Sequence, residues 1–182
     1  MPIAYKIAES TSVMFPSAWV GLAYLKLGRT DDARRVLDRA LRWGETRIGL
    51  RAFATAYLTM VRAFAYLTHG DHAQAIAWAR RALRLADEGR FTLERGASHR
   101  VLGQALEASG QRADAETAFR QSLAILGGIQ SLSELGQTLL AYGRFRLADD
   151  RDTGRRLIER AAAIFEEIGA TGWSAETSAA LA

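Results

Sequence analysis

The sequence contains no cysteine, only two prolines, and only two lysines, Lys6 and Lys26, among its 182 residues. Without cysteine, the chain cannot form disulfide bonds or thiolate-bound metal sites. Proline breaks helices, whereas alanine, leucine and arginine, which dominate the composition, favour them. No long run of Val, Ile and Thr suggests a strand. The composition therefore predicts an all-α protein.

Long apolar runs are also absent. The longest uncharged apolar run, AFATAYLTMV, lies between Arg51 and Arg62. It is far shorter than the roughly 20 residues that a membrane-spanning helix needs. The first residues, MPIAYKIAES, include no apolar stretch of signal-peptide length. We therefore expect a cytoplasmic protein with no membrane partner.

The charge balance is moderately basic, with 24 Lys and Arg against 20 Asp and Glu. Such an excess can indicate a nucleic-acid partner, and Arg80, Arg81 and Arg84 are the best candidates for contacting one. The excess can equally reflect the codon bias of a GC-rich genome, which also fits the absence of asparagine. Acidic residues are interspersed with the arginines almost everywhere, which favours this second interpretation. A nucleic-acid-binding helical repeat protein remains the alternative function.

The chain contains an internal repeat of about 40 residues. Four segments align without gaps: GRTDDARRVLDRAL (28–41), GDHAQAIAWARRAL (70–83), GQRADAETAFRQSL (110–123) and DDRDTGRRLIERAA (149–162). The sixth column contains small residues: Ala33, Ala75, Ala115 and Gly154. The thirteenth column also contains small residues: Ala40, Ala82, Ser122 and Ala161. The tenth column is apolar: Leu37, Ala79, Phe119 and Ile158. Small residues seven apart share one helix face and let a neighbouring helix approach closely.

A second helix is predicted before each of these segments. Seven residues before the first three turns lies another small residue, Gly21, Ala63 or Gly103, and the fourth copy has Tyr142 and Gly143 there. A glycine at the turn suits the left-handed conformation that ends a helix, and Thr30 and Asp71 can cap the next one. In the fourth copy Asp149 replaces that glycine. We predict helices over 13–27, 31–43, 47–68, 72–88, 91–108, 112–126, 131–148 and 152–168. Glycines 44, 89, 127, 128 and 169 are predicted to link the repeats.

These features resemble the tetratricopeptide repeat (TPR), most closely in GDHAQAIAWARRALRL (70–85). The resemblance implies an α-α superhelix, a TPR-like solenoid, in one domain over residues 1–182. Its repeats would span 13–43, 47–88, 91–126 and 131–168, followed by a terminal helix at 171–181. These units are longer than the usual 34 residues. In this they are similar to helical arrays in large bacterial signalling ATPases, including LuxR-type transcription regulators, and in nucleotide cyclases.

The resemblance also implies where a partner binds, because the first helix of each TPR pair lines a concave groove. The groove positions carried over to this chain are Phe15, Leu22, Lys26, Tyr57, Met60, Phe64, Arg100, Gln104, Glu107 and Arg146. The first half of this groove is apolar and the second half polar. Phe15, Leu22 and Phe64 could instead pack against the neighbouring repeat.

We find no catalytic constellation in the sequence. Phosphate-binding, dinucleotide-binding and H-E-x-x-H motifs are all absent. His69 and His72 could share a metal, but surface histidines at a turn are the better interpretation. Trp19, Trp43 and Trp78 lie in alanine-rich helices and are predicted to fill the core. We therefore expect no enzyme activity, no metal and no cofactor. The predicted function is a protein-interaction or scaffold module, serving as the sensor or regulatory segment of a larger signalling protein.

Both ends of the predicted array look unfinished. Residues 5–10 read like the end of a helix whose start is missing, and residues 171–182 like half of a further pair. We expect either a piece of a longer array or a chain that covers its ends by self-association, for example as a homodimer. Alternatively, the terminal helix folds over Phe165 and Ile168 and caps the array.

Overall fold

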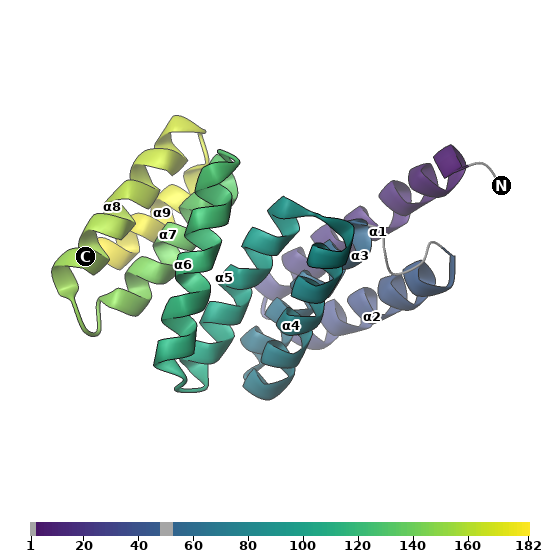
Figure 1. Ribbon diagram of the computed structural model, residues 1–182, viewed down its shortest axis with the longest axis horizontal. Helices are drawn as coiled ribbons and strands as arrows, with labels where there is room; N and C mark the ends of the chain where they lie inside the picture. Colours follow the sequence, from purple (N-terminus) through teal and green to yellow (C-terminus); the bar gives the residue numbers. More distant parts are fainter. Residues whose placement is uncertain (1–2, 48–52) are drawn as a thin grey trace.

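The computed structural model describes residues 3–47 and 53–182, and within these ranges α-helices joined by short turns are the only regular structure (Figure 1). The helices are α1 (Ile3–Lys26), α2 (Thr30–Arg47), α3 (Phe53–His69), α4 (His72–Gly89), α5 (Thr92–Ala108), α6 (Arg112–Gly128), α7 (Leu132–Arg146), α8 (Arg151–Glu167) and α9 (Thr171–Leu181). They form a TPR-like solenoid, which confirms the fold class predicted from the sequence.

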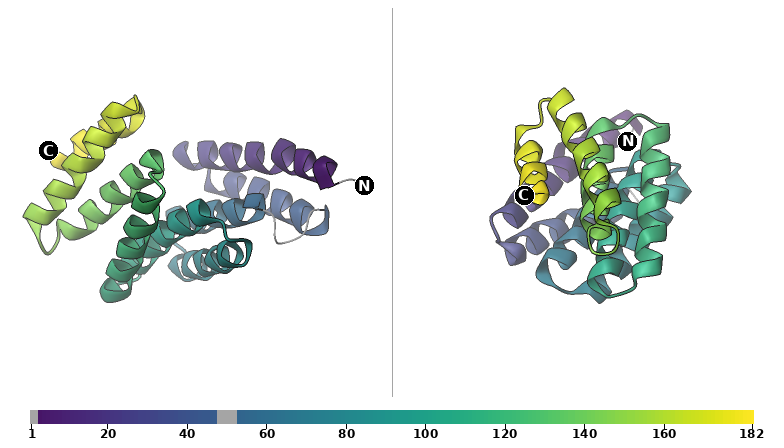
Figure 2. Two further views of the ribbon diagram at one scale, coloured as in Figure 1. Left: turned by 45° about the horizontal axis from the view of Figure 1, so that its top comes forward. Right: turned by 90° about the vertical axis from the view of Figure 1, so that its left-hand side faces the viewer.

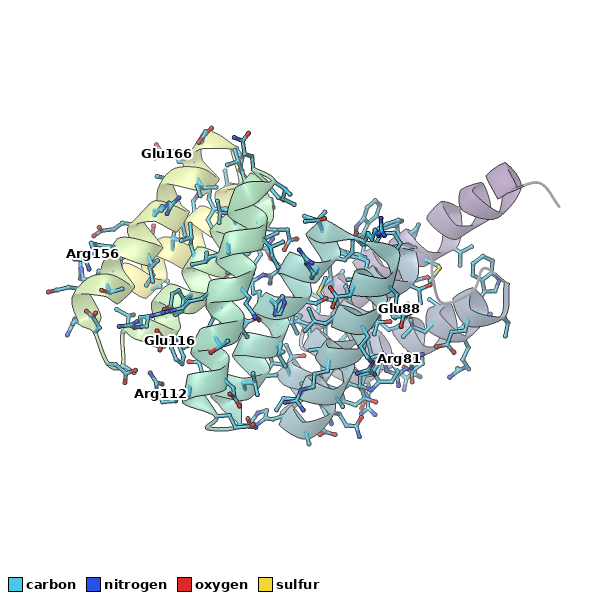
Figure 3. All side chains as sticks on the ribbon, in the orientation of Figure 1. Arg81, Glu88, Arg112, Glu116, Arg156 and Glu166 are labelled. Carbon is cyan, nitrogen blue, oxygen red and sulfur yellow. The ribbon has the colours of Figure 1, made fainter. Side chains whose placement is uncertain are left out.

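The odd-numbered helices form the inner layer of the array. Successive odd helices contact each other, from α1 with α3 through to α7 with α9, whereas the even helices contact only odd ones. The even helices therefore lie on the outside. Figure 3 shows labelled charged side chains, such as Arg81 on α4 and Arg156 on α8, on this outer layer. The array curves so that α9 approaches the end of α1 (Figure 2), where the Lys26 ammonium lies 5.2 Å from the centre of the Trp173 ring.

The small-residue columns of the repeat are buried between the helices, as predicted. The sixth-column alanines Ala33, Ala75 and Ala115 are fully buried, as are all four tenth-column residues. At Gly103 a Cβ atom would lie 2.9 Å from the Phe119 ring, so the glycine allows α5 and α6 to approach closely. Ser122 adds a polar contact, because its hydroxyl donates to the Gly96 carbonyl oxygen at 2.8 Å.

The turns within the first three pairs also match the prediction. Gly28, Gly70 and Gly110 have φ values of 71°, 84° and 80°, the left-handed conformation that glycine adopts without strain. The Asp71 carboxylate accepts from the Gln74 amide at 3.1 Å and caps α4. Thr30, by contrast, lies within α2, and its hydroxyl contacts the Gly28 carbonyl oxygen at 3.5 Å.

The prediction was wrong in several places between the pairs and at the first helix. Gly44 is no link: it lies inside α2, and a Cβ there would come within 2.5 Å of the Met14 side chain. Helix α2 therefore continues to residue 47, where we had expected α3 to begin. Helix α1 runs unbroken from residue 3, because residues 10–12 include no helix-ending glycine or proline.

Two of the links use an unexpected residue in the left-handed conformation. Arg90 has φ 57° and Gln130 has φ 54°, whereas the predicted link glycines 89, 127 and 128 lie in the last turns of α4 and α6. A side chain in this conformation costs about 1 kcal/mol, which glycine avoids. We therefore expect Gln130→Gly to raise the free energy of unfolding by up to about 1 kcal/mol. Urea denaturation checks this, and a lower midpoint would contradict it.

The surroundings of Trp19 also differ from the prediction. It was predicted to fill the core, but 62% of the residue is exposed. Trp43 and Trp78 are half-buried and pack against the core, in agreement with the prediction. An aromatic residue among alanines is buried only if a neighbouring helix covers that face, and α1 has none on its Trp19 side among the described residues.

Candidate partner-binding groove

In the described part of the chain, the inner helices line a cavity of about 470 Å³. All five odd-numbered helices contribute to its wall. Helix α3 supplies Tyr57, Met60, Val61, Phe64 and Thr68, whose spacing of three and four residues places them on one helix face. We call this cavity the inner groove. The remaining lining residues are Leu22, Leu25, Lys26, Arg100, Val101, Gln104, Glu134, Gln137, Leu140, Ala141, Arg144, Trp173 and Glu176.

Seven of the ten residues predicted from the sequence lie on this wall: Leu22, Lys26, Tyr57, Met60, Phe64, Arg100 and Gln104. Their role in binding stays a prediction. The other three, Phe15, Glu107 and Arg146, do not line the cavity. Phe15 packs against Tyr57, with ring centres 5.5 Å apart, so it supports the wall from behind.

Glu107 and Arg146 have other surroundings. The Arg146 guanidinium pairs with Glu116 of α6 and with Asp150, both at 3.2 Å. Glu107 is half-buried, and this burial raises the pKa of its carboxyl group. Both residues lie close to the C-terminal ends of their helices, beyond the turns that surround the cavity.

The wall is divided into an apolar and a polar part, as the sequence predicts. Helices α1 and α3 contribute mainly apolar side chains, including Leu22, Met60 and Phe64. Helices α5 and α7 contribute polar side chains, including Gln104 and Gln137. The division is not complete, because Leu140 and Ala141 of α7 and Trp173 of α9 add apolar surface on the far side.

Ion pairs hold most of the charged groups of the groove. Arg100 pairs with Glu134 across α5 and α7, with only 10% and 22% of the two side chains exposed. Arg144 pairs with Glu176 at 3.7 Å and joins α7 to α9. Among the described residues, Lys26 has no carboxylate within ion-pair distance, and its ammonium lies over the Trp173 ring. The groove therefore keeps one uncompensated positive charge at its α1 edge.

Burial changes the titration of two groups near the polar wall. Burial, with a further contribution from the nearby Glu134 carboxylate, raises the pKa of the Tyr57 hydroxyl. The same two causes raise the pKa of Glu94, at the start of α5. A tyrosine hydroxyl is uncharged at neutral pH in any case, so Tyr57 offers a hydrogen-bond donor on the groove wall.

Sequence reasoning missed the contribution of α9. Trp173 and Glu176 lie about 150 residues from Lys26 in the sequence, and only the curvature of the array brings them to the same cavity. Other missed residues, such as Val61 and Val101, adjoin predicted ones along the chain, and a full helical face would have included them. No group of three or more His, Asp or Glu side chains in the described part of the chain could hold a metal ion. No described helix is long and apolar enough to cross a membrane.

The comparisons with known proteins agree with this geometry. Residues 15–88, which span α1 to α4 except for the first turns of α1, match a family model described as "Tetratricopeptide repeat". No curated protein is significantly similar to the chain in sequence.

Solved structures resemble the array over most of its length. One comprises the nearly identical TPR-like repeats assigned to a kinesin light chain of Podosopora anserina, with a TM-score of 0.66 and 16% identity. That match covers 92% of this chain and 86% of the other. BtubC (BKLC) from P. vanneervenii has a TM-score of 0.65 and 14% identity, over 92% of this chain and 75% of that one. At these identities the likeness concerns the fold.

Proposed function

We propose that the chain is a protein-interaction module that holds a peptide or helix of a partner protein in the inner groove. The convergence of five helices on one cavity with an apolar and a polar wall supports this most directly. The volume of about 470 Å³ lies within the range of ligand sites and can take a few side chains of a partner. TPR-like folds generally serve as protein-binding scaffolds, and they are generally not catalytic.

The proposal can be tested by selecting peptides that bind the chain from a displayed random library. We expect the selected peptides to bind Tyr57→Ala and Gln137→Ala about tenfold or more weakly, as for residues at the centre of an interface. Arg84→Ala, on the outer helix α4, is the matched control and should bind normally. Circular dichroism measures whether each variant is folded. Peptides whose affinity is unchanged by both groove variants would show that the binding site lies elsewhere.

Arg100 is a poor choice for a test of the groove, although the sequence predicts it to be a groove residue. Removing its side chain would leave Glu134 unpaired in a largely buried position and weaken the fold itself. Tyr57 and Gln137 have no such ion-pair partner, so a loss of binding in their variants can be assigned to the groove.

The nucleic-acid alternative has less support. Of its three candidate residues, Arg81 pairs with Glu45 at 2.5 Å and stacks on the Trp78 ring, which leaves Arg80 and Arg84 exposed. Nucleic-acid binding needs a continuous row of free cations. Titration with random oligonucleotides at low ionic strength decides the question, and measurable, salt-sensitive binding would favour this alternative.

Three narrower statements belong to the same proposal. The chain would act as the sensor or scaffold segment of a bacterial signalling protein, such as a transcription regulator, and it would be cytoplasmic. It would form one domain of four helix pairs and a terminal helix. The coding sequence on either side of this stretch tests the first statement, cell fractionation the second and limited proteolysis the third.

Self-association through an end of the array stays a prediction. At the C-terminal end, α9 covers part of the apolar surface: the Trp173 ring stacks on Phe165, with centres 5.6 Å apart, and Phe165 is fully buried. Ile168 remains 39% exposed, so the covering is partial. Sedimentation equilibrium over a wide concentration range distinguishes a monomer from a dimer.

A further inference from the structure

Helix α1 carries an exposed apolar stripe on the side away from α2. Trp19 and Leu27 are 62% and 70% exposed, and Val13 and Val20 are 38% and 44% exposed. Pro16 and Ala23 are also exposed, and the spacing of three and four residues places the set along one side of the helix, with Leu27 directly after its last residue. We call these six residues the α1 stripe. A contiguous apolar surface of this kind marks an interaction site.

Three of these six positions, those of Pro16, Trp19 and Ala23, are buried in every later inner helix. The equivalents of Leu27 are exposed in the later pairs as well. Aligning the four pairs on Gly21, Ala63, Gly103 and Gly143 gives the equivalents of each residue of the α1 stripe. Those of Trp19 are Val61, Val101 and Ala141, which are 1%, 1% and 8% exposed. Those of Pro16 are Leu58, Ser98 and Thr138, all fully buried. Those of Ala23 are Ala65, Ala105 and Phe145, exposed by at most 2%.

The preceding helix pair accounts for this burial. Each of α3, α5 and α7 contacts both helices of the pair before it, one inner and one outer. One of these contacts is a hydrogen bond: Thr138, an equivalent of Pro16, lies against Ser122 of α6, with 3.0 Å between the two hydroxyl oxygens. Ser122 belongs to the thirteenth repeat column, otherwise occupied by alanine. A small residue of an outer helix therefore faces this position.

Helix α1 differs from α3 and α7 in the charged residues at this junction. Arg62 of α3 pairs with Asp38 of α2 at 2.5 Å, and Arg146 of α7 pairs with Glu116 of α6 at 3.2 Å. The α1 equivalents of these arginines are Val20 and Tyr24. The junction on α1 therefore needs no carboxylate from its partner, and a charge facing the stripe would be buried without a counter-ion.

We infer that the α1 stripe binds a neighbouring helical repeat, whose outer helix presents alanine and leucine and no charge. A second copy of this chain fits less well. The outer helices α2, α4, α6 and α8 are each already contacted by the following inner helix, α3, α5, α7 and α9 respectively. Among the described residues, a second copy therefore has no free outer-helix face of the required kind. The stripe also lies apart from the inner groove, since none of its residues lines that cavity.

The inference can be tested by supplying such a repeat. In the alignment, Ser10 is equivalent to Thr92, so a copy of residues 53–91 joined directly before Ser10 places an α3–α4 pair ahead of α1. The control chimera has Ala82→Glu in the added copy, which puts a charge on the contact face. Each protein is followed by urea unfolding and by acrylamide quenching of Trp19, taken as the difference from the Trp19→Phe variant.

We expect the chimera to unfold at a higher urea concentration than both the original chain and the control chimera, with loss of Trp19 quenching. Trp19→Glu should cancel that gain in the chimera, yet leave the midpoint of the original chain unchanged. Equal midpoints for the two chimeras would overturn the inference. So would a dimer of the original chain that Trp19→Glu dissociates, because the occupant would then be a second copy. Peptide binding in the inner groove is unaffected by Trp19→Glu, which keeps the two proposals separate.

Discussion

Replacing Gly154 by alanine should lower the free energy of unfolding by about 2–3 kcal/mol, because the added methyl group has no room. A Cβ atom at this position would lie 2.8 Å from the Leu147 amide nitrogen and 2.9 Å from the Gly143 carbonyl oxygen. Both are backbone atoms, which cannot turn aside as a side chain can. Helices α7 and α8 would have to move apart, and the buried Ile158 side chain of α8 would lose contacts with α7.

The control for this variant is Gly172→Ala in α9. A Cβ atom there meets nothing within 4 Å, so alanine should be neutral or gain up to about 1 kcal/mol from its better helix propensity. Urea unfolding of the two variants beside the original chain measures the difference. Equal stabilities for Gly154→Ala and Gly172→Ala would mean that α7 and α8 are less closely packed than described.

Gly154 also illustrates why the fold could be predicted from the sequence. It is the fourth member of a column otherwise filled by alanine, and that column exists because every helix pair repeats the same close approach. The turn glycines mark where each pair reverses, since Gly28, Gly70 and Gly110 all adopt the left-handed conformation. A constraint that recurs four times is visible in one sequence without any alignment.

Features that depend on non-repeated surroundings could not be predicted in this way. Trp19 has the local sequence of a core residue, but burial also needs a covering helix, and none in the described part of the chain lies beside it. Gly44 was interpreted as a link because glycine commonly ends helices. Here it instead makes room for Met14 of α1. A glycine required by a tertiary contact and one required by a turn look alike in the sequence.

Only part of the inner groove could be predicted, because the rest of it also depends on surroundings that do not repeat. Residues such as Tyr57, Met60 and Phe64 follow from the face of one helix, which its periodicity reveals. Trp173 and Glu176 reach the groove only because small rotations between successive pairs add up over the whole array. Those rotations depend on side-chain packing at each junction, and the sequence pattern does not specify their sum.

Arg100→Leu should also destabilise the fold strongly, by about 3 kcal/mol. The Arg100 guanidinium and the Glu134 carboxylate form an ion pair between α5 and α7 in which both side chains are mostly buried. Leucine fills much of the arginine volume, but it leaves the Glu134 carboxylate without its counter-ion in a poorly hydrated position. The resulting cost is that of an uncompensated buried charge.

The double variant Arg100→Leu with Glu134→Leu identifies the cause of that loss. Removing both charges should recover most of the stability, because two apolar side chains can replace a buried pair at little cost. Arg144→Leu is the matched control: its pair with Glu176 also joins two inner helices, but 47% and 40% of those side chains are exposed. Such an exposed pair contributes less than about 1 kcal/mol. If urea unfolding shows that the double variant is as unstable as Arg100→Leu alone, the loss comes from packing around the arginine side chain and not from the buried charge.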